Sequence, residues 1–253
     1  MFSSFFQSVT PTQEYDHNLP EHIRKRATQT QYHHPDTERM MSALHFNENN
    51  TEIKVNELNP TTLGEIAEAT NCSTVHFSGN CALLARCLLY NLKSGRNVLA
   101  VSNTYPFHES ISGVVANNIL FEKELRTYKY ASSVDQLEAE LLNAFQETGE
   151  RCFLINVDRK QVLFSLIDVI IPGHAMNAVV AGSGDNAKVL FADAWKTWGS
   201  IHTTESLERR AFTVDYYKIQ YHEGPTLYKE LVTQDKIVPV DSNQTPRTGR
   251  GYF

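Results

Sequence analysis

The pattern of hydrophobic and polar positions divides the chain into three parts. Residues 1–50 are rich in Ser, Thr, Gln, Asn and His and show little hydrophobic periodicity. Such a segment buries too little apolar surface to offset the entropy lost on ordering. We therefore expect a disordered or loosely packed leader with one short helix at residues 21–26. Residues 51–235 have the patterning of a folded domain, and residues 236–253 read as a polar tail.

Helical patterns come first within the domain. Residues 81–94 (CALLARCLLYNLKS) are apolar on almost every side, which is typical of a buried central helix. Gly95 follows at the position where glycine commonly ends a helix. A second helix is predicted over residues 133–148, where an N-terminal capping pattern precedes an apolar stripe. A shorter helix is expected over residues 60–69.

Strand patterns dominate the later part of the domain. These segments are rich in Val, Ile, Phe and Tyr and are bounded by Gly, Pro, Asn and Asp. A short strand at residues 97–102 precedes them. Helices followed by mostly antiparallel strands indicate an α+β fold. The later strands are predicted at residues 152–157, 161–171, 174–181, 188–195 and 212–222.

Composition and charge exclude several functions. The chain has 253 residues, of which 41% are hydrophobic, enough for one packed core. Its 23 basic and 29 acidic residues give a formal net charge of −6, which argues against a nucleic-acid partner. No apolar run reaches the ~18–20 residues of a membrane span. The beginning of the chain lacks the pattern of a Sec signal peptide. Four cysteines fit neither a disulfide scaffold nor a zinc motif.

Cys81 is the first candidate for chemistry because it opens the buried helix. A cysteine attacks as its thiolate, and the N-terminus of a helix favours that anion through its free N–H groups and its dipole. Gly79 would allow backbone and substrate to approach closely. Cys72 is a rival nucleophile on a loop, and two further cysteines are interpreted as small buried hydrophobes. These two are Cys87 and Cys152.

His174 and Asp193 are predicted to meet across a hairpin. If strands 174–181 and 188–195 pair symmetrically about the turn-rich loop between them, the numbers of opposite residues sum to 369. This register makes His174 and Asp193 diagonal neighbours on one face, provided that no bulge intervenes. Asp193 would then orient His174, and His174 would act as the base for Cys81. Asn177 is the competing orienter, but its parity places it on the opposite face.

Three segments together resemble one known family. GNCALLARCLLYNLKSG opens the helix, GHAMNAVV begins one strand and VLFADAW ends the next. Their order and context are similar to those of the papain-fold toxin and effector group, which includes bacterial type III effector glutamine deamidases. The resemblance covers about residues 70–200 and implies a papain-like fold, with the nucleophile, base and orienter being Cys81, His174 and Asp193. The glutamine that precedes the cysteine in papain-like proteases is absent, which leaves Asn71, Asn80, Gly79 or backbone N–H groups as oxyanion donors.

The resemblance also implies a function and a setting. It suggests a protein-glutamine deamidase that acts on a host protein, including proteins of the ubiquitin pathway, after secretion by a bacterium without a Sec signal peptide. The expected place of action is the host cytoplasm. A papain-like protease or deubiquitinase-like isopeptidase is the first alternative, and a non-catalytic binding module is the second. No cofactor and no metal site are expected, since the run His33, His34 and His45 lacks acidic or Cys partners.

Overall fold

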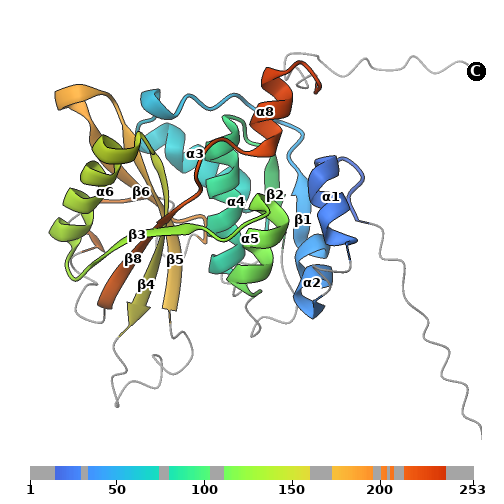
Figure 1. The fold of residues 1–253 in the computed structure, drawn as a ribbon, viewed down its shortest axis with the longest axis horizontal. Coiled ribbons are helices and arrows are strands. Elements are labelled where there is room, and N and C mark those ends of the chain that lie inside the picture. The colour runs from blue at the N-terminus through green and yellow to red at the C-terminus, as the bar shows by residue number, and fades with distance from the viewer. Residues whose placement is uncertain are drawn as a thin grey trace, which may run out of the picture.

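A helical lobe packs against a six-stranded antiparallel sheet in the computed structural model (Figure 1). The structure describes residues 15–29, 34–73, 80–102, 111–159, 173–195, 201–203, 206–207 and 214–237. The strand order is β3-β8-β4-β5-β6-β7. The strands are β3 (Arg126–Ala131), β4 (Cys152–Arg159), β5 (Gly173–Ala181), β6 (Lys188–Ala192), β7 (Ile201–His202) and β8 (Val214–Tyr221).

The helical lobe surrounds α4 and includes a small second sheet, β1-β2. Its strands are β1 (Leu44–Phe46) and β2 (Leu99–Val101), and two 3-10 turns occupy Val55–Glu57 and Gly184–Asn186. The helices are α1 (Glu21–Ala27), α2 (Pro35–Ala43), α3 (Pro60–Thr70), α4 (Cys81–Ser94), α5 (Gly113–Phe121), α6 (Val134–Thr148) and α8 (Leu227–Thr233).

The large sheet lies between two hydrophobic cores. Its side chains alternate between the faces along β5, so that Met176 and Ala178 join the core under α6, whereas Ala175 and Val179 join the core around α4. Helix α4 therefore lies against the sheet on one side and α6 covers the other (Figure 1). Truncating a fully buried leucine of either core would cost about 2–5 kcal/mol.

The predicted α+β fold is confirmed, and so are its main elements. The helix over residues 81–94 has the predicted bounds, and Gly95 ends it with a left-handed φ of 69°. The strand predicted at 188–195 ends earlier, at Ala192, because Asp193 leaves the sheet to contact His174. The strand predicted at 161–171 lies outside the described residues.

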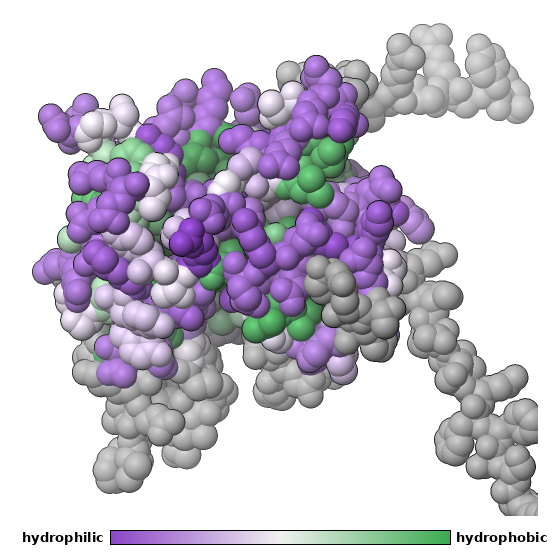
Figure 2. All heavy atoms as spheres, in the orientation of Figure 1, coloured by the Kyte–Doolittle hydropathy of each residue, from purple (hydrophilic) through white to green (hydrophobic). Residues whose placement is uncertain are grey.

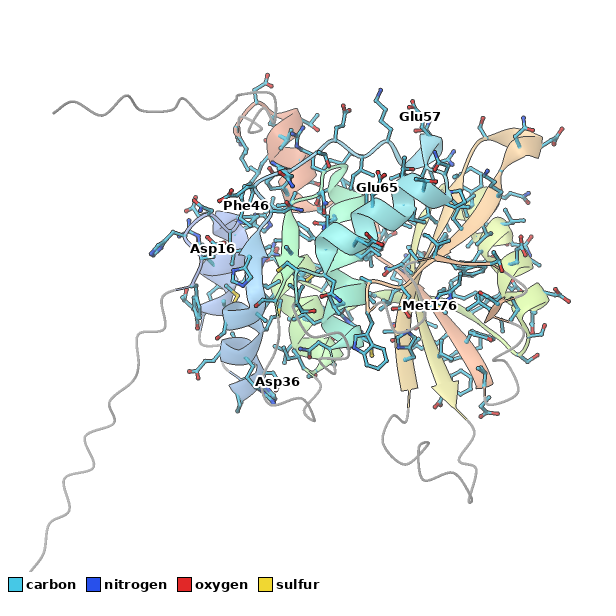
Figure 3. The ribbon with its side chains drawn as sticks, turned by 180° about the vertical axis from the view of Figure 1, so that it is seen from behind. Asp16, Asp36, Phe46, Glu57, Glu65 and Met176 are labelled. Atoms are coloured by element: carbon cyan, nitrogen blue, oxygen red, sulfur yellow. The ribbon has the colours of Figure 1, made fainter. Side chains whose placement is uncertain are left out.

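The prediction of a disordered or loosely packed leader over residues 1–50 is wrong for residues 15–29 and 34–50. Helices α1 and α2 and strand β1 pack on the core, and Leu19, Ile23 and Met40 are at most 1% exposed. Asp16 also accepts a hydrogen bond from the Phe46 N–H at 2.8 Å, and Figure 3 shows the two residues side by side. The few apolar residues of this polar segment are buried against distant elements, which local periodicity does not reveal.

The visible face of the molecule is largely hydrophilic, with hydrophobic surface confined to small patches (Figure 2). Among the residues that the structure describes, the large hydrophobic side chains most exposed are Val114 and Tyr130. Within the same residues, no helix has the length and apolar character needed to cross a membrane.

Candidate active site

Cys81 is the first residue of α4, and its side chain is partly exposed at the end of an otherwise buried helix. The next residues inward, such as Leu84 and Leu88, are at most 1% exposed. The thiol therefore lies where the helix dipole is positive and where the first backbone N–H groups lack intrahelical acceptors. This position suits an anion, whether a thiolate or a developing oxyanion.

The hairpin of β5 and β6 brings His174 to Asp193. Its register runs without a bulge from Asn177 opposite Ala192 to Ala181 opposite Lys188, so paired residue numbers sum to 369 as predicted. Immediately beyond the last pair, His174 Nε2 lies 2.7 Å from Asp193 Oδ2. The predicted register is thus confirmed, and the predicted contact is present.

Asp193 is held by three groups although it is only 1% exposed. Its Oδ1 accepts a hydrogen bond from the Trp195 N–H at 2.9 Å, and its Oδ2 contacts His174 and lies 3.6 Å from His202 Nε2. Burial alone would raise the pKa of Asp193. The charge of His174, the hydrogen bonds from His174 and the Trp195 N–H, and the nearby His202 outweigh burial and hold the pKa of Asp193 well below its usual range.

Cys81 and His174 shift each other toward an ion pair. Burial opposes ionisation of the thiol, but the hydrogen bond and charge of His174, together with the Ala175 N–H, lower the pKa of Cys81 below 9.0. Burial also opposes the imidazolium, yet Asp193 and then Cys81 raise the pKa of His174 to about 10. Both shifts therefore favour the ionised pair, a thiolate beside an imidazolium.

The two ring nitrogens of His174 have different partners. Nε2 contacts Asp193 Oδ2, and the interaction of the ring with the Cys81 thiol lowers the pKa of that thiol. Nδ1 is buried and has no hydrogen-bond partner among the described residues. The Trp195 ring lies beside the imidazole, with the two centroids 5.3 Å apart. Asp193 thus orients the imidazole through Nε2, and Nδ1 remains free to exchange a proton.

The expected oxyanion donors are in different situations. Asn80 directly precedes Cys81 and is fully buried. Its Oδ1 accepts the Ile111 N–H at 3.4 Å, while its Nδ2 has no partner among the residues that the structure describes. Asn71 does not have a free amide, since its Nδ2 donates to the Ala194 carbonyl at 2.8 Å. The expectation that Asn71 is an oxyanion donor is therefore corrected: its amide supports the turn after Asp193 instead. Gly79 lies outside the described residues.

Two polar residues near the site were not expected from the sequence to act there, and a third has a different partner from the one considered. His202 contacts Asp193 from the two-residue strand β7. No sequence pattern indicates this contact, because it depends on the pairing of His202 with Phe191. Asn177 had been considered only as an orienter of His174, but its amide donates to a carbonyl of α4. Arg86 is a buried cation on α4 that interacts electrostatically with Cys81.

The other thiols are less suited to nucleophilic attack. Cys87 and Cys152 are buried, as predicted, and burial raises the pKa of both, that of Cys152 to about 12. Cys72 is exposed on the loop after α3. Among the described residues, His, Cys, Asp and Glu side chains form no group of three or more that could hold a metal ion.

The fold and the site define an α+β protein in which a cysteine at the start of a helix meets a histidine and an aspartate at the ends of two strands of an antiparallel sheet. The profile of the family described as "Salmonella plasmid virulence protein SpvD" matches residues 23–221. The chain belongs to this family and is a homologue of a Salmonella virulence effector.

Curated relatives and solved structures agree with this assignment. Virulence protein vsdE of Salmonella typhimurium and virulence protein SpvD of Salmonella dublin are each 28% identical over 192 residues, which is 74% of this chain and 86% of each relative. The fold is similar to two solved variants of the Salmonella effector SpvD, with TM-scores of 0.68 and 0.60 and identities of 24% and 22%. Each match covers 79% of this chain and 98% of the solved chain.

Proposed function

We propose that this chain is a cysteine hydrolase that acts on a host protein, with Cys81 as nucleophile, His174 as acid and base, and Asp193 as orienter. One observation carries the proposal: His174, held by Asp193 at 2.7 Å, lowers the pKa of the Cys81 thiol. A thiolate paired with an imidazolium is the arrangement that activates cysteine nucleophiles. The helix-borne cysteine, the strand-borne histidine and the following aspartate also occur in the order typical of papain-like hydrolases.

The reaction proceeds in two balanced halves. The Cys81 thiolate attacks a carbonyl carbon and forms a C–S bond; the C–N bond then breaks as the His174 imidazolium gives its proton to the departing nitrogen. Ammonia or an amine leaves, and a thioester remains. Water next attacks the thioester while neutral His174 accepts its proton, and cleavage of the C–S bond releases the acid and restores the thiol–imidazole pair.

The oxyanion formed in each half needs hydrogen-bond donors. Asn80 is our assignment for the side-chain donor, because its buried Nδ2 has no partner in the described parts of the chain and it directly precedes Cys81. The backbone N–H groups at the start of α4 supply the others. Loss of one such donor typically costs ~10²–10³ in rate, so replacing Asn80 by Ala should slow hydrolysis far more than it changes thiol reactivity.

The specific reaction that we propose is deamidation of a glutamine side chain, with the effector acting after secretion into the host cell. Family membership supports action on a host target, since the relatives are named as virulence proteins and effectors. The same three residues would also hydrolyse a peptide or isopeptide bond, and the difference lies in the leaving nitrogen. The experiment below therefore separates deamidation from hydrolysis of a peptide bond.

The test is incubation of the full chain with a host-cell lysate, with the Cys81→Ala variant as the matched control. Mass spectrometry follows conversion of Gln to Glu and the appearance of new N-termini, and an enzymatic assay follows ammonia. Ammonia and Gln-to-Glu conversion without new N-termini support deamidation. New N-termini that depend on Cys81 would overturn deamidation in favour of peptide hydrolysis, and products identical to those of Cys81→Ala would overturn the hydrolase itself.

A further inference from the structure

We propose that Asn177 is a positioning residue that fixes helix α4 along strand β5 and thereby sets the approach of Cys81 to His174. This inference rests on the hydrolase function proposed above. Asn177 is fully buried, and its Nδ2 donates to the carbonyl of Ala85 at 2.9 Å and to that of Phe153 at 3.4 Å. The first carbonyl belongs to the helix that carries Cys81, so this amide joins helix and sheet directly.

Two contacts fix the helix along the strand at matched spacings. The Ala175 N–H donates to the Cys81 thiol, and Asn177 donates to Ala85. From Cys81 to Ala85 is four residues, or about 6 Å of helix rise. From Ala175 to Asn177 is two residues, or about 6.7 Å of strand. The two contacts are therefore in register, and sliding α4 along β5 would break both together.

Asn177 is also connected to the third member of the site. It is paired with Ala192 in the β5–β6 ladder, and Ala192 is the residue before Asp193. On its own strand it follows His174 by three residues. A single buried side chain therefore lies on or next to the segments that hold Cys81, His174 and Asp193.

A purely structural role does not explain this amide. Asn177 Oδ1 is buried and has no hydrogen-bond partner within the described part of the chain, and leaving such a group unpaired costs about 1–3 kcal/mol. Its neighbours on the same face of β5, Ala175 and Val179, are apolar and belong to the core around α4. A leucine of similar volume would fill the site without an unsatisfied oxygen. Keeping the amide is explained if the directional bond to α4 serves the site.

Asn91 provides a matched control on the same helix. It is also fully buried, and its Nδ2 donates to the Leu99 carbonyl at 2.8 Å, while its Oδ1 accepts the N–H groups of Val98 and Leu99. These bonds join α4 to β2 at ten residues from Cys81. Asn91 is thus a buried structural amide that is separate from the site.

The test compares the wild type, Asn177→Leu, Asn177→Ser and Asn91→Leu by the rate of iodoacetamide alkylation between pH 5 and pH 10. Intact mass spectrometry and peptide mapping assign the label to each cysteine. Buried Cys87 and Cys152 report unfolding, so Cys81 rates are taken only from molecules in which both remain unlabelled. This selection keeps the measurement valid for variants of low stability.

In Asn177→Leu we expect alkylation of Cys81 at pH 6 to fall at least about tenfold, with the rate–pH profile displaced to higher pH by about one unit. Asn177→Ser retains one hydroxyl donor and should lie between this variant and the wild type. Asn91→Leu should lower thermal stability and leave the Cys81 profile unchanged. A wild-type profile in folded Asn177→Leu overturns the positioning role and leaves the hydrolase proposal standing. Slow, unselective labelling of wild-type Cys81 would instead overturn the hydrolase proposal, and the positioning role with it.

Discussion

His174 Nε2 lies 2.7 Å from Asp193 Oδ2, although the two residues are separated by a whole β-hairpin. This contact leaves Nδ1 without a hydrogen-bond partner among the described residues. It also places a buried carboxylate where it stabilises the imidazolium. In the proposed mechanism, the reactivity of Cys81 therefore depends on Asp193, which acts through His174.

Asp193→Asn should leave the fold intact and weaken the site. The amide nearly preserves the shape of the side chain, and its oxygen can still accept the Trp195 N–H, but the negative charge that raises the pKa of His174 to about 10 is lost. We expect kcat/KM for hydrolysis to fall about 10²-fold or more. Near-wild-type thermal stability checks the fold, and undiminished turnover would contradict the assigned role.

The pH dependence of Cys81 alkylation should show the ion pair. The thiolate forms as the pH rises through the lowered pKa of Cys81, and the imidazolium is lost as the pH rises through about 10. The ion pair is therefore present between these two pKa values. His174→Ala removes the group that lowers the thiol pKa, while burial still opposes ionisation, so alkylation at pH 6 should fall at least about tenfold.

The matched control for this variant is His222→Ala. His222 is also buried but contacts Phe121 and the Gly224 carbonyl instead of the site. The pH profile of Cys81 alkylation in His222→Ala should follow that of the wild type at every pH at which the variant is folded. A similar displacement in both variants would show that loss of any buried imidazole disturbs the thiol, contrary to a specific pair with His174.

His202→Gln should have an intermediate effect on the site. His202 Nε2 lies 3.6 Å from Asp193 Oδ2, and its hydrogen bond helps to lower the pKa of that carboxyl. Without the second imidazole Asp193 is less firmly oriented, so we expect a several-fold loss in kcat/KM, smaller than that of Asp193→Asn. His202→Ala should lose more, because it also leaves a cavity at a position that is 5% exposed. A Gln variant as impaired as Asp193→Asn would show that His202 does more than orient the carboxylate.

The strongest sequence signals were local, and they predicted helix α4 and the β5–β6 register correctly. The segment that is apolar on all sides predicted the bounds of α4. The turn residues, together with period-two alternation, predicted the register of the hairpin that joins His174 to Asp193. Both signals concern residues close in the sequence. The contact of Cys81 with His174 joins segments 93 positions apart and became an expectation only through the order of motifs and the family resemblance.

The residues that sequence reasoning missed depend on tertiary contacts. His202 belongs to a strand of two residues, too short for any periodicity, and becomes relevant only opposite Phe191. Asn177 looks like an ordinary polar residue within a strand until its partner, the Ala85 carbonyl, is known. In the leader, Ile23 and Met40 are buried by elements far along the chain. Local hydrophobic pattern contains none of this information.

Acid should destabilise the fold through two histidines outside the site, the partly buried His22 and the buried His222. His22 donates or accepts a hydrogen bond with the Tyr90 hydroxyl at 2.8 Å, and His222 packs on Phe121. Burial, and then neighbouring positive charge, lowers the pKa of each to about 4. Because the unfolded chain binds these protons near pH 6.5, the stability that they contribute is present above pH 6.5 and is lost as the pH falls toward 4.

The expected loss is about 2 kcal/mol for each residue, measured as the free energy of unfolding in urea at pH 7 and pH 4.5. His222→Phe keeps the ring contact with Phe121 and removes one titrating group, so its stability should fall less on acidification than that of the wild type. An equal fall in both proteins would assign the acid sensitivity to other groups.

Gly182 should be needed for the hairpin that aligns His174 with Asp193. Its φ of +78° is in the left-handed region, and a Cβ at this position would lie 2.4 Å from the Asn186 carbonyl oxygen. Neither the chain at Gly182 nor this backbone oxygen can move without shifting the turn. We expect Gly182→Ala to cost about 2–4 kcal/mol in the free energy of unfolding.

Gly184 is the matched control, because it lies in the same turn with a φ of +53° and open space around the position of a Cβ. Gly184→Ala should cost only about 1 kcal/mol, the penalty of a left-handed conformation alone. Since the turn sets the β5–β6 register, Gly182→Ala should also displace the Cys81 alkylation profile to higher pH, whereas Gly184→Ala should not. Equal effects of the two alanines on both stability and thiol reactivity would show that the tight contact with Asn186 does not set the register of the hairpin.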